Sequence, residues 1–313
     1  MLVGLINPAA GHKPAVDLAH VLASASPRLR LLMSDREDDL DSLIASLTAT
    51  PAQLLVIAGG DGTVCSLVTR FHRAGAIAHL PPLLVLPAGR VNTVASALVG
   101  SRRPAQLAQR ILHAWSRGVR LFRSVPVLEV QVGDQPVWAG FTVSLGALAR
   151  MHRDYRSGWL QGTGGVAELV ARLALQRLPP QRFAPLGGAL LAEPEPVRLQ
   201  QVTLGILSAL PHFFGVVRPF PAANGISAHG VYFAVAGTGS LATQAMLPGL
   251  LRGLLGHHPQ VQYGQTKQMS WRSGANPDLL VLDGEELTIP PNTVVTIREL
   301  QRVKMLVWRD LPA

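Results

Sequence analysis

Three short polar stretches near the start of the chain contain residue types that could bind phosphate groups. GGDGT (59–63) places three glycines around one carboxylate, directly after the apolar run LLVIA (54–58). Glycines let backbone N–H groups approach a phosphate closely, and the N-terminus of a following helix favours anions. NPAAGHK (7–13) and LPAGRVN (86–92) follow two further apolar runs in the same way. The pattern predicts three phosphate-compatible loops, with Asp61 facing a metal ion or the transferred group.

Simpler interpretations of these motifs stay open at this point. GGDGT also fits a tight turn in which Asp61 caps a helix that begins near Thr63. Far downstream, LDGEEL (282–287) carries three carboxylates, but a DG pair between apolar runs is typical of a hairpin turn. A catalytic role for these residues therefore depends on whether the motifs come together.

The elements that must position the first three motifs alternate along the chain. Short apolar runs of strand type alternate with segments whose apolar residues recur at helical spacing, which predicts a parallel sheet covered on both faces. Ligands bind at the carboxyl ends of the strands of such sheets, so the three loops should share one edge. We expect strands at 2–6, 29–33, 54–58 and 83–87, and helices at 14–24, 34–49, 63–75 and 104–118.

The pattern changes after Gly118 to extended segments separated by turn residues, which predicts a mostly antiparallel β region. A convincing helical pattern covers 166–178, and a weaker one covers 247–256. We predict an α/β domain over 1–122, to which 296–313 returns, and a β-rich domain over 123–295. The extended segments are 124–132, 136–145, 197–207, 230–237 and 277–289.

Composition narrows the class of protein. The chain has 313 residues, a hydrophobic fraction of 48%, a charged fraction of 15% and one cysteine, which suits a folded protein of a reducing compartment. The formal net charge of +9 favours anionic partners, but no dense basic block with interleaved aromatics indicates nucleic-acid binding. No apolar stretch reaches the ~18 residues of a membrane span, and the start lacks a signal-peptide pattern. We expect a cytoplasmic protein, with attachment to the inner face of the membrane as an option.

Taken together, the motifs resemble the diacylglycerol kinase catalytic-domain family, which includes bacterial lipid kinases and sphingosine and ceramide kinases. The LPxG…N loop and the late DGE separate this family from NAD kinases and phosphofructokinases, which share GGDGT. The matching residues are Asn7, Pro8 and Gly11, then Gly59, Gly60, Asp61, Gly62 and Thr63, then Leu86, Pro87, Ala88, Gly89 and Asn92, and finally Asp283, Gly284 and Glu285.

The resemblance implies a nucleotide-binding α/β domain and a β-sandwich that covers a lipid site, with ATP and Mg²⁺ as cofactors. It implies that Glu285 is the general base, that Asp283 supports it or binds Mg²⁺, and that Asp61 completes the catalytic set. Phosphoryl transfer needs little more than a phosphate cradle, a metal and a base. The implied nucleotide-binding residues are Asn7, Pro8, Gly11, Ser34, Gly59, Gly60, Asp61, Gly62, Thr63, Ser66, Gly89, Arg90 and Asn92.

The sequence departs from the family at several polar positions. Cys65 and Ser66 stand where the family has Asn-Glu, and Arg90 and Thr93 replace the Thr and Asp of its LPxGTxND loop. Leu148 replaces an aspartate, and His229 stands where a magnesium-binding aspartate is usual, so the metal site is not transferred to this chain. Arg90 could pair with a phosphate or fill the site.

Two functions from the same resemblance follow, and a third stays open. The leading one is ATP-dependent phosphorylation of a hydroxyl of diacylglycerol or a related lipid at a membrane surface. The second is a kinase-like protein that binds nucleotide or lipid without efficient transfer, and the third is a kinase of a soluble substrate. A homodimer is also left open. Two stretches that combine arginines with apolar residues, 173–188 and 210–220, either dock on an anionic bilayer or belong to the core.

Overall fold

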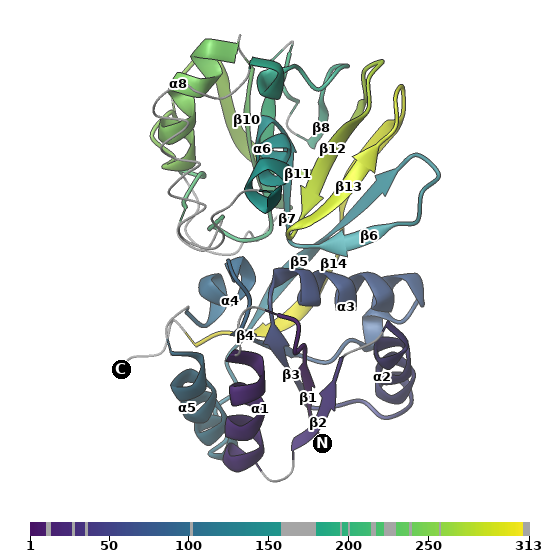
Figure 1. The fold of residues 1–313 in the computed structure, drawn as a ribbon, viewed down its shortest axis with the longest axis vertical. Coiled ribbons are helices and arrows are strands. Elements are labelled where there is room, and N and C mark those ends of the chain that lie inside the picture. The colour runs from purple at the N-terminus through teal and green to yellow at the C-terminus, as the bar shows by residue number, and fades with distance from the viewer. Residues whose placement is uncertain are drawn as a thin grey trace. The chain divides into compact units, whose positions relative to one another are not determined.

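A computed structural model describes residues 1–10, 14–26, 29–34, 37–100, 103–157, 180–194, 196–199, 201–213, 217–221, 230–237, 240–256 and 258–308. The chain forms two compact units (Figure 1). Unit 1 contains Met1–Val125 and the C-terminal stretch from Arg302, and unit 2 contains Pro126–Phe213 and Val217–Gln301. The divisions fall inside two long strands, and the domain boundaries predicted from the sequence stay predictions.

Unit 1 is built on a parallel sheet whose strand order is β14-β4-β3-β1-β2. Its two central strands, β3 and β4, are buried along their whole length, as expected of parallel strands with helices on both faces. The α/β part of the predicted fold class is thus confirmed. The strands are β1 (Leu2–Ile6), β2 (Leu29–Met33), β3 (Leu54–Gly59), β4 (Leu83–Pro87) and the end of β14 (Val294–Leu306).

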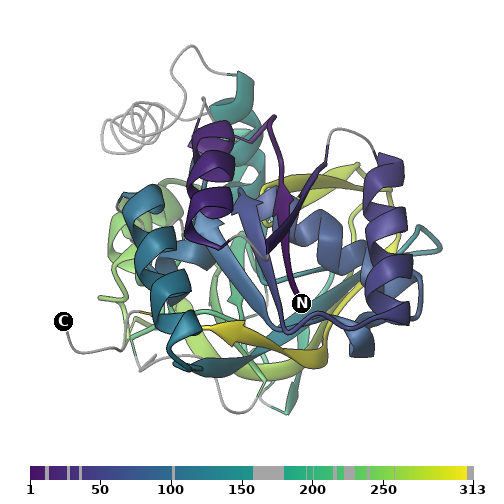
Figure 2. The same ribbon diagram turned by 90° about the horizontal axis from the view of Figure 1, so that it is seen from below.

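Helices cover both faces of this sheet. Helices α1 (Pro14–Ala25) and α5 (Pro104–Ser116) pack against each other on one side, while α2 (Glu37–Ala49) and α3 (Asp61–Arg73) pack on the other (Figure 2). In α3 the apolar residues at helical spacing are all buried, which explains why this segment is helical. A short helix that the sequence did not predict, α4 (Thr93–Leu98), follows the loop after β4.

Unit 2 is a mostly antiparallel β structure, as predicted, with the strand order β13-β12-β7-β9-β10-β11-β14. Strand β8 also pairs with β11, and β5 pairs with β6 and β14. The strands are β5 (Phe122–Val132), β6 (Trp138–Gly140), β7 (Thr142–Gly146), β8 (Leu191–Pro194), β9 (Leu204–Ser208), β10 (Val231–Ala236), β11 (Val261–Arg272), β12 (Asp278–Leu282) and β13 (Glu285–Ile289).

The helices of unit 2 differ from the sequence prediction. Helix α6 (Ala147–Ser157) packs on β7 and β12 and was not predicted, although Leu148 and Met151 are buried at helical spacing. Helix α8 spans Ser240–Leu251 rather than 247–256 and contains Pro248. The predicted helix at 166–178 lies outside the described residues. A single turn of 3-10 helix covers Pro180–Phe183.

The aromatic residues of the two stretches considered for membrane docking belong to the core where they are described. Phe183, Phe213 and Phe220 are each no more than 5% exposed. Phe220 also stacks on Tyr232 of β10, with ring centroids 5.4 Å apart. The described part of 173–188 and 210–220 therefore keeps its aromatic rings away from solvent.

Candidate active site

The first predicted loop is tied to the start of α3 by an asparagine. Asn7 Nδ2 donates a hydrogen bond to Thr63 Oγ1 over 2.9 Å, and Asn7 Oδ1 accepts one from the backbone N–H of Ala9. Pro8 follows in the same turn, whereas Gly11 lies outside the described residues. Ser34, at the end of β2, is held by a backbone bond from its N–H to the carbonyl of Ile6. The loops after β1, β2 and β3 thus meet at one edge of the sheet.

The loops after β3 and β4 touch through glycines. A Cβ at Gly89 would overlap the Cα of Gly60, and one at Gly60 would lie 3.1 Å from the Cα of Gly89. A Cβ at Gly59 would lie 2.7 Å from the Thr63 side chain. Contact between two backbones is one of the situations that only glycine permits. Gly60 and Gly89 are therefore required by packing, whether or not a phosphate binds beside them.

Asn92 fixes the shape of the loop after β4. Its backbone is in the left-handed region, with φ of 56°, which asparagine tolerates better than most residues. Its side chain accepts a hydrogen bond from the N–H of Gly89 and donates one to the carbonyl of Gly89, both 2.7 Å long. The predicted nucleotide-binding residue Asn92 thus holds the turn that presents Arg90.

Asp61 is the first residue of α3, but its carboxylate caps a different helix. Its two oxygens accept hydrogen bonds from the backbone N–H groups of Thr93 and Val94, over 2.8 and 3.0 Å. These are the first two amides of α4, which have no partner within their own helix. Burial raises the pKa of Asp61 above its ordinary value, against the opposing effect of the two backbone bonds. The cap that we considered for α3 is therefore made to α4, and the metal-facing role of Asp61 stays a prediction.

The start of α3 keeps two amides that have no helical partner. Helix α3 has no side-chain cap, and the carbonyl of Gly60 accepts the N–H groups of Thr63 and Val64. The N–H groups of Asp61 and Gly62 come before these and point out of the helix end. The thirteen-residue helix places its positive dipole end at the same point. This end of α3 is the part of the unit best suited to phosphate oxygens.

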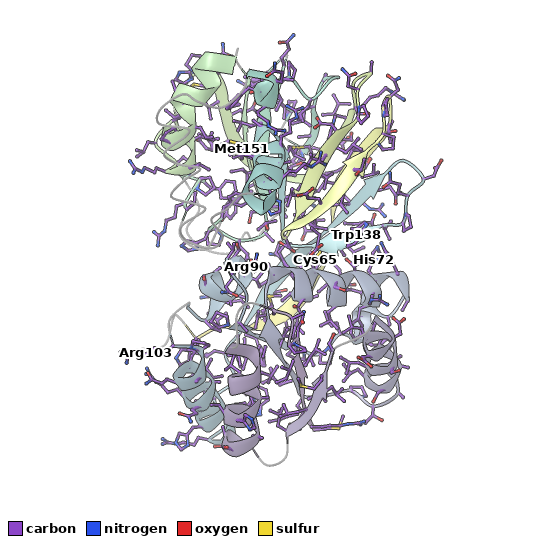
Figure 3. The ribbon with its side chains drawn as sticks, in the orientation of Figure 1. Cys65, His72, Arg90, Arg103, Trp138 and Met151 are labelled. Atoms are coloured by element: carbon purple, nitrogen blue, oxygen red, sulfur yellow. The ribbon has the colours of Figure 1, made fainter. Side chains whose placement is uncertain are left out.

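Three residues that depart from the family pattern, Arg90, Cys65 and Ser66, lie close to this helix end. Arg90 is exposed on the loop between β4 and α4, and no described residue hydrogen-bonds or pairs with its guanidinium (Figure 3). Cys65 is fully buried in α3, as expected of a small apolar residue, and Ser66 beside it is partly exposed. Arg90 is therefore a cation available to a phosphate, while Cys65 contributes to the core.

In unit 2, Asp283 and Gly284 form the two-residue turn between β12 and β13. Both have positive φ, 48° and 92°, as the tight hairpin turns of antiparallel strands require. The carboxylate of Asp283 is buried and accepts hydrogen bonds from the N–H groups of Phe141 and Thr142, over 2.8 and 2.9 Å. The Thr142 hydroxyl donates a third bond of 2.6 Å. Asp283 thus fastens the hairpin to the segment between β6 and β7.

Glu285 follows this turn with a carboxylate that is not engaged. It is partly exposed, and no hydrogen bond or ion pair joins it to another described residue. It pairs across the hairpin with Leu282, so both side chains share one face of the sheet. Glu286 points to the opposite face, where its oxygens lie 3.4 Å from His152 Nδ1 and 3.3 Å from Arg153 Nε on α6. Of the carboxylates in this motif, Glu285 is the one available to take a proton.

Unit 2 has an apolar residue, Leu148, at one position where the family has an aspartate. Leu148, which replaces an aspartate, is buried in the first turn of α6, and His229 lies outside the described residues. Among the described side chains, no group of three His, Cys, Asp or Glu residues gathers that could hold a metal ion. The described part of the chain thus offers no metal centre made of its own side chains.

Sequence reasoning missed the partners that orient the two aspartates. Thr93, Val94, Phe141 and Thr142 act mainly through backbone N–H groups, which carry no residue-specific signal in a sequence. The helix α4 was the one detectable feature, because TVASAL follows an asparagine and a glycine-bearing turn.

None of the described helices is both long enough and apolar enough to cross a membrane.

Comparison with known proteins relates this geometry to a family. The family model "Diacylglycerol kinase catalytic domain" matches residues 1–124. Two curated proteins named "Probable lipid kinase YegS-like" are each 25% identical to this chain. The one from Xanthomonas campestris pv. campestris (strain 8004) aligns over 162 residues, 51% of this chain and 50% of its own. The one from Xanthomonas axonopodis pv. citri (strain 306) aligns over 146 residues, which are 46% of this chain and 45% of its own. The alignments thus span about half the length of these relatives.

Solved structures extend the likeness in fold to nearly the whole chain. A crystal structure described as "a putative diacylglycerol kinase from Bacillus anthracis str. Sterne" superposes with a TM-score of 0.71 at 16% identity, covering 98% of this chain and 96% of its own. A second structure, of "a diacylglycerol kinases" from the same organism, superposes with a TM-score of 0.63 at 15% identity. It covers 98% of this chain and 96% of its own. At such identities the likeness concerns the fold. Residues 1–124 match the diacylglycerol kinase catalytic-domain family, which confirms the resemblance drawn from the motifs, and the whole chain has the fold of diacylglycerol-kinase-like proteins.

Proposed function

We propose that this protein is an ATP-dependent lipid kinase that phosphorylates a hydroxyl group of diacylglycerol or a related lipid. The observation that carries the proposal is the loop cluster at the edge of the unit 1 sheet, within the segment that matches the kinase family. There the carboxylate of Asp61 is turned to α4, so the amides at the start of α3 stay available to an anion.

Unit 1 would hold the nucleotide. The N–H groups of Asp61 and Gly62 and the guanidinium of Arg90 supply donors for phosphate oxygens, and the Asn7 loop is fixed beside them. ATP supplies the transferable phosphoryl group, and Mg²⁺ would arrive bound to its phosphates, as is usual for this ion. The described residues offer donors that suit phosphates, whereas they offer no metal cage of their own.

Unit 2 would supply the base. The hairpin turn is fastened by Asp283, which places Glu285 on a fixed strand end rather than on a loose loop. Glu285 would accept the proton of the lipid hydroxyl as its oxygen attacks the terminal phosphorus and the bond to the leaving ADP oxygen breaks. Positioned bases contribute typically 10²–10⁴-fold in rate. Asp283 would act as a positioning residue, because its oxygens are already engaged.

The test is transfer of labelled phosphate from ATP and Mg²⁺ to a panel of lipid alcohols in mixed micelles. In Glu285→Gln we expect the rate to fall by about 10²–10⁴-fold with nucleotide binding unchanged. Glu286→Gln is the matched control, because it removes the neighbouring carboxylate from the opposite face of β13. Transfer that persists at the full rate in Glu285→Gln would exclude Glu285 as the base.

A second candidate is a kinase-like protein that binds nucleotide or lipid without efficient transfer. The observation in its favour is that Asp61 and Asp283 each use both carboxylate oxygens for backbone hydrogen bonds. Leu148 and Thr93, where the family has aspartates, provide no replacement. Nucleotide binding by calorimetry, with no labelled lipid across the panel, would select this candidate over the kinase.

A further inference from the structure

The charges of the chain are segregated along the sequence. From Gly62 to Leu128 there is no aspartate or glutamate, while nine arginines fall in the same interval. All nine belong to unit 1. They are Arg70, Arg73, Arg90, Arg102, Arg103, Arg110, Arg117, Arg120 and Arg123.

Three of these arginines form a stripe along α5. Arg103 directly precedes the helix, Arg110 lies in its middle and Arg117 directly follows it. All three are exposed (Figure 3 labels Arg103). Residues seven apart lie almost on the same line of an α-helix, so the stripe extends over about 21 Å. No described carboxylate pairs with any of the three. The buried face of α5, which includes Ile111 and Trp115, points away from this line.

A shallow apolar groove runs beside the stripe. It is lined by Ile111 and Ala114 of α5, by Val119 and Leu121 of the following turn, and by Trp308 after β14. The guanidinium of Arg110 lies 5.9 Å from the centre of the Trp308 ring, so Arg110 borders the groove.

The turn beside the groove is itself both basic and apolar. Val119 and Leu121 are 37% and 40% exposed, although both are aliphatic. Arg120, between them, lies 3.4 Å from the centre of the Trp115 ring and donates hydrogen bonds to the carbonyls of Trp115 and Val119. The carbonyl of Leu121 accepts the N–H of Val307, so the turn is held in place.

We propose that the α5 stripe and the adjacent turn, Arg103, Arg110, Arg117, Val119 and Leu121, dock unit 1 on an anionic membrane surface. Arginines beside a bilayer attract anionic headgroups, and exposed aliphatic side chains between them enter the boundary with the acyl chains. This surface lies outside the described parts of 173–188 and 210–220, whose aromatic rings are buried.

The observations favour a membrane over other occupants. Nucleic acid would match the charge, but single-stranded binders stack bases on aromatic side chains. Here the exposed side chains beside the stripe, Val119 and Leu121, are aliphatic, and the Trp308 ring of the groove already lies against the guanidinium of Arg110. A second copy of this chain would bring two arginine stripes face to face, which like-charge repulsion opposes. The inference goes beyond the proposed function, although the two agree, because a lipid kinase must reach a substrate in a bilayer.

The test is co-sedimentation of the full chain with vesicles of phosphatidylcholine, alone and mixed with phosphatidylglycerol. We expect binding to the mixed vesicles at about 0.1 M salt and weak binding at about 1 M, where the Debye length falls from ~10 to ~3 Å. Each arginine removed should weaken binding about fivefold, so the triple variant Arg103→Gln, Arg110→Gln, Arg117→Gln should lose roughly a hundredfold. The pair Val119→Asn, Leu121→Asn should weaken the binding that remains at high salt.

The matched control removes three exposed positive charges elsewhere, Arg30→Gln, Arg198→Gln and Lys267→Gln, and should bind the mixed vesicles within a few-fold of the wild type. If the stripe variant proves misfolded, the same three positions changed to lysine keep the charge and should keep the binding. Equal losses in the stripe and control variants would overturn the assignment, as would no binding to the mixed vesicles. A stripe variant that lost binding to duplex DNA but not to vesicles would also overturn it.

Vesicle binding is measured without turnover, so the two proposals fail separately. If the protein binds vesicles through α5 but transfers no phosphate to any lipid, only the proposed kinase activity is wrong. If it phosphorylates a dispersed short-chain lipid but does not bind vesicles, only the proposed docking surface is wrong.

Discussion

Asp61 and Asp283, each followed by a glycine, can be compared directly, because each uses its carboxylate in the same way. Asp61 in unit 1 accepts the N–H groups of two consecutive residues, Thr93 and Val94. Asp283 in unit 2 accepts those of Phe141 and Thr142. In both cases the carboxylate fastens its own segment, the start of α3 or the turn between β12 and β13, to a segment distant in sequence. Both aspartates therefore have a structural role, whatever chemistry they also serve. Each carboxylate with its backbone hydrogen bonds is called a joint below.

The difference between the two joints lies in what they leave available. Asp61 holds the start of a short helix and lies at the start of α3, where unpaired amides remain for an anion. Asp283 is 6% exposed, takes a third bond from the Thr142 hydroxyl, and leaves the next-but-one residue, Glu285, unengaged. In each motif the aspartate therefore holds the backbone in place. The groups left available to bind or react are its neighbours, the first amides of α3 in unit 1 and Glu285 in unit 2.

The sharpest way to break this comparison is Asp283→Ala. Removal of the carboxylate leaves three buried donors without a partner, and each such donor costs about 1–3 kcal/mol. We expect unit 2 to lose about 3 kcal/mol or more of stability in denaturant titration, with faster hydrogen exchange at Phe141 and Thr142. Asp134→Ala, which removes an exposed aspartate from the turn before β6, is the control and should change little. A fully stable Asp283→Ala protein would mean that the hairpin does not depend on this joint.

A smaller effect is expected for Asp61→Ala. A helix-capping side chain contributes typically about 1 kcal/mol, and up to about 2 in the strongest cases. The first turn of α4 should open, which hydrogen exchange would detect at Thr93 and Val94. Asp41→Ala breaks only an exposed ion pair with Arg70 in the same unit and should leave those two amides protected. Unchanged exchange in Asp61→Ala would show that α4 is held by packing alone, and Asp61 would then be free for another role.

The sequence was a good guide to the elements whose pattern is local. The unit 1 strands Leu2–Ile6, Leu29–Met33 and Leu83–Pro87 have the predicted limits, because each is a short, mainly apolar run bounded by turn residues. Strand β11 was missed, because VQYGQTKQMSWR contains glycine, glutamines and a lysine. Its extended form comes from pairing with β10 and β14 on either side.

The candidate site was predictable in its motifs and less so in its contacts. The glycines of GGDGT and LPAG suggested room for phosphates, but Gly60 and Gly89 are also required because their backbones touch. Likewise, no local pattern could show that Asp61 would reach α4, because its partners are backbone amides thirty-two and thirty-three residues away. Contacts between segments distant in sequence depend on the sheet order, which the motifs do not encode.

The smallest expected effect is the pH dependence of the Asp61 joint. Burial raises the pKa of Asp61 above its ordinary value of 3.8, so the folded protein holds this proton more tightly than the unfolded chain does. The stability that protonated Asp61 contributes is therefore present in full at pH values below its ordinary pKa. It is lost as the pH rises through the pKa of Asp61 in the folded protein. Asp61→Asn cannot titrate, so the difference in stability between wild type and variant should shrink as pH rises through that range. The carboxyl carbon shift of Asp61 measures its pKa directly. A pKa below the ordinary value of 3.8 would mean that the hydrogen bonds outweigh burial, and that the contribution of Asp61 to stability grows rather than falls as pH rises.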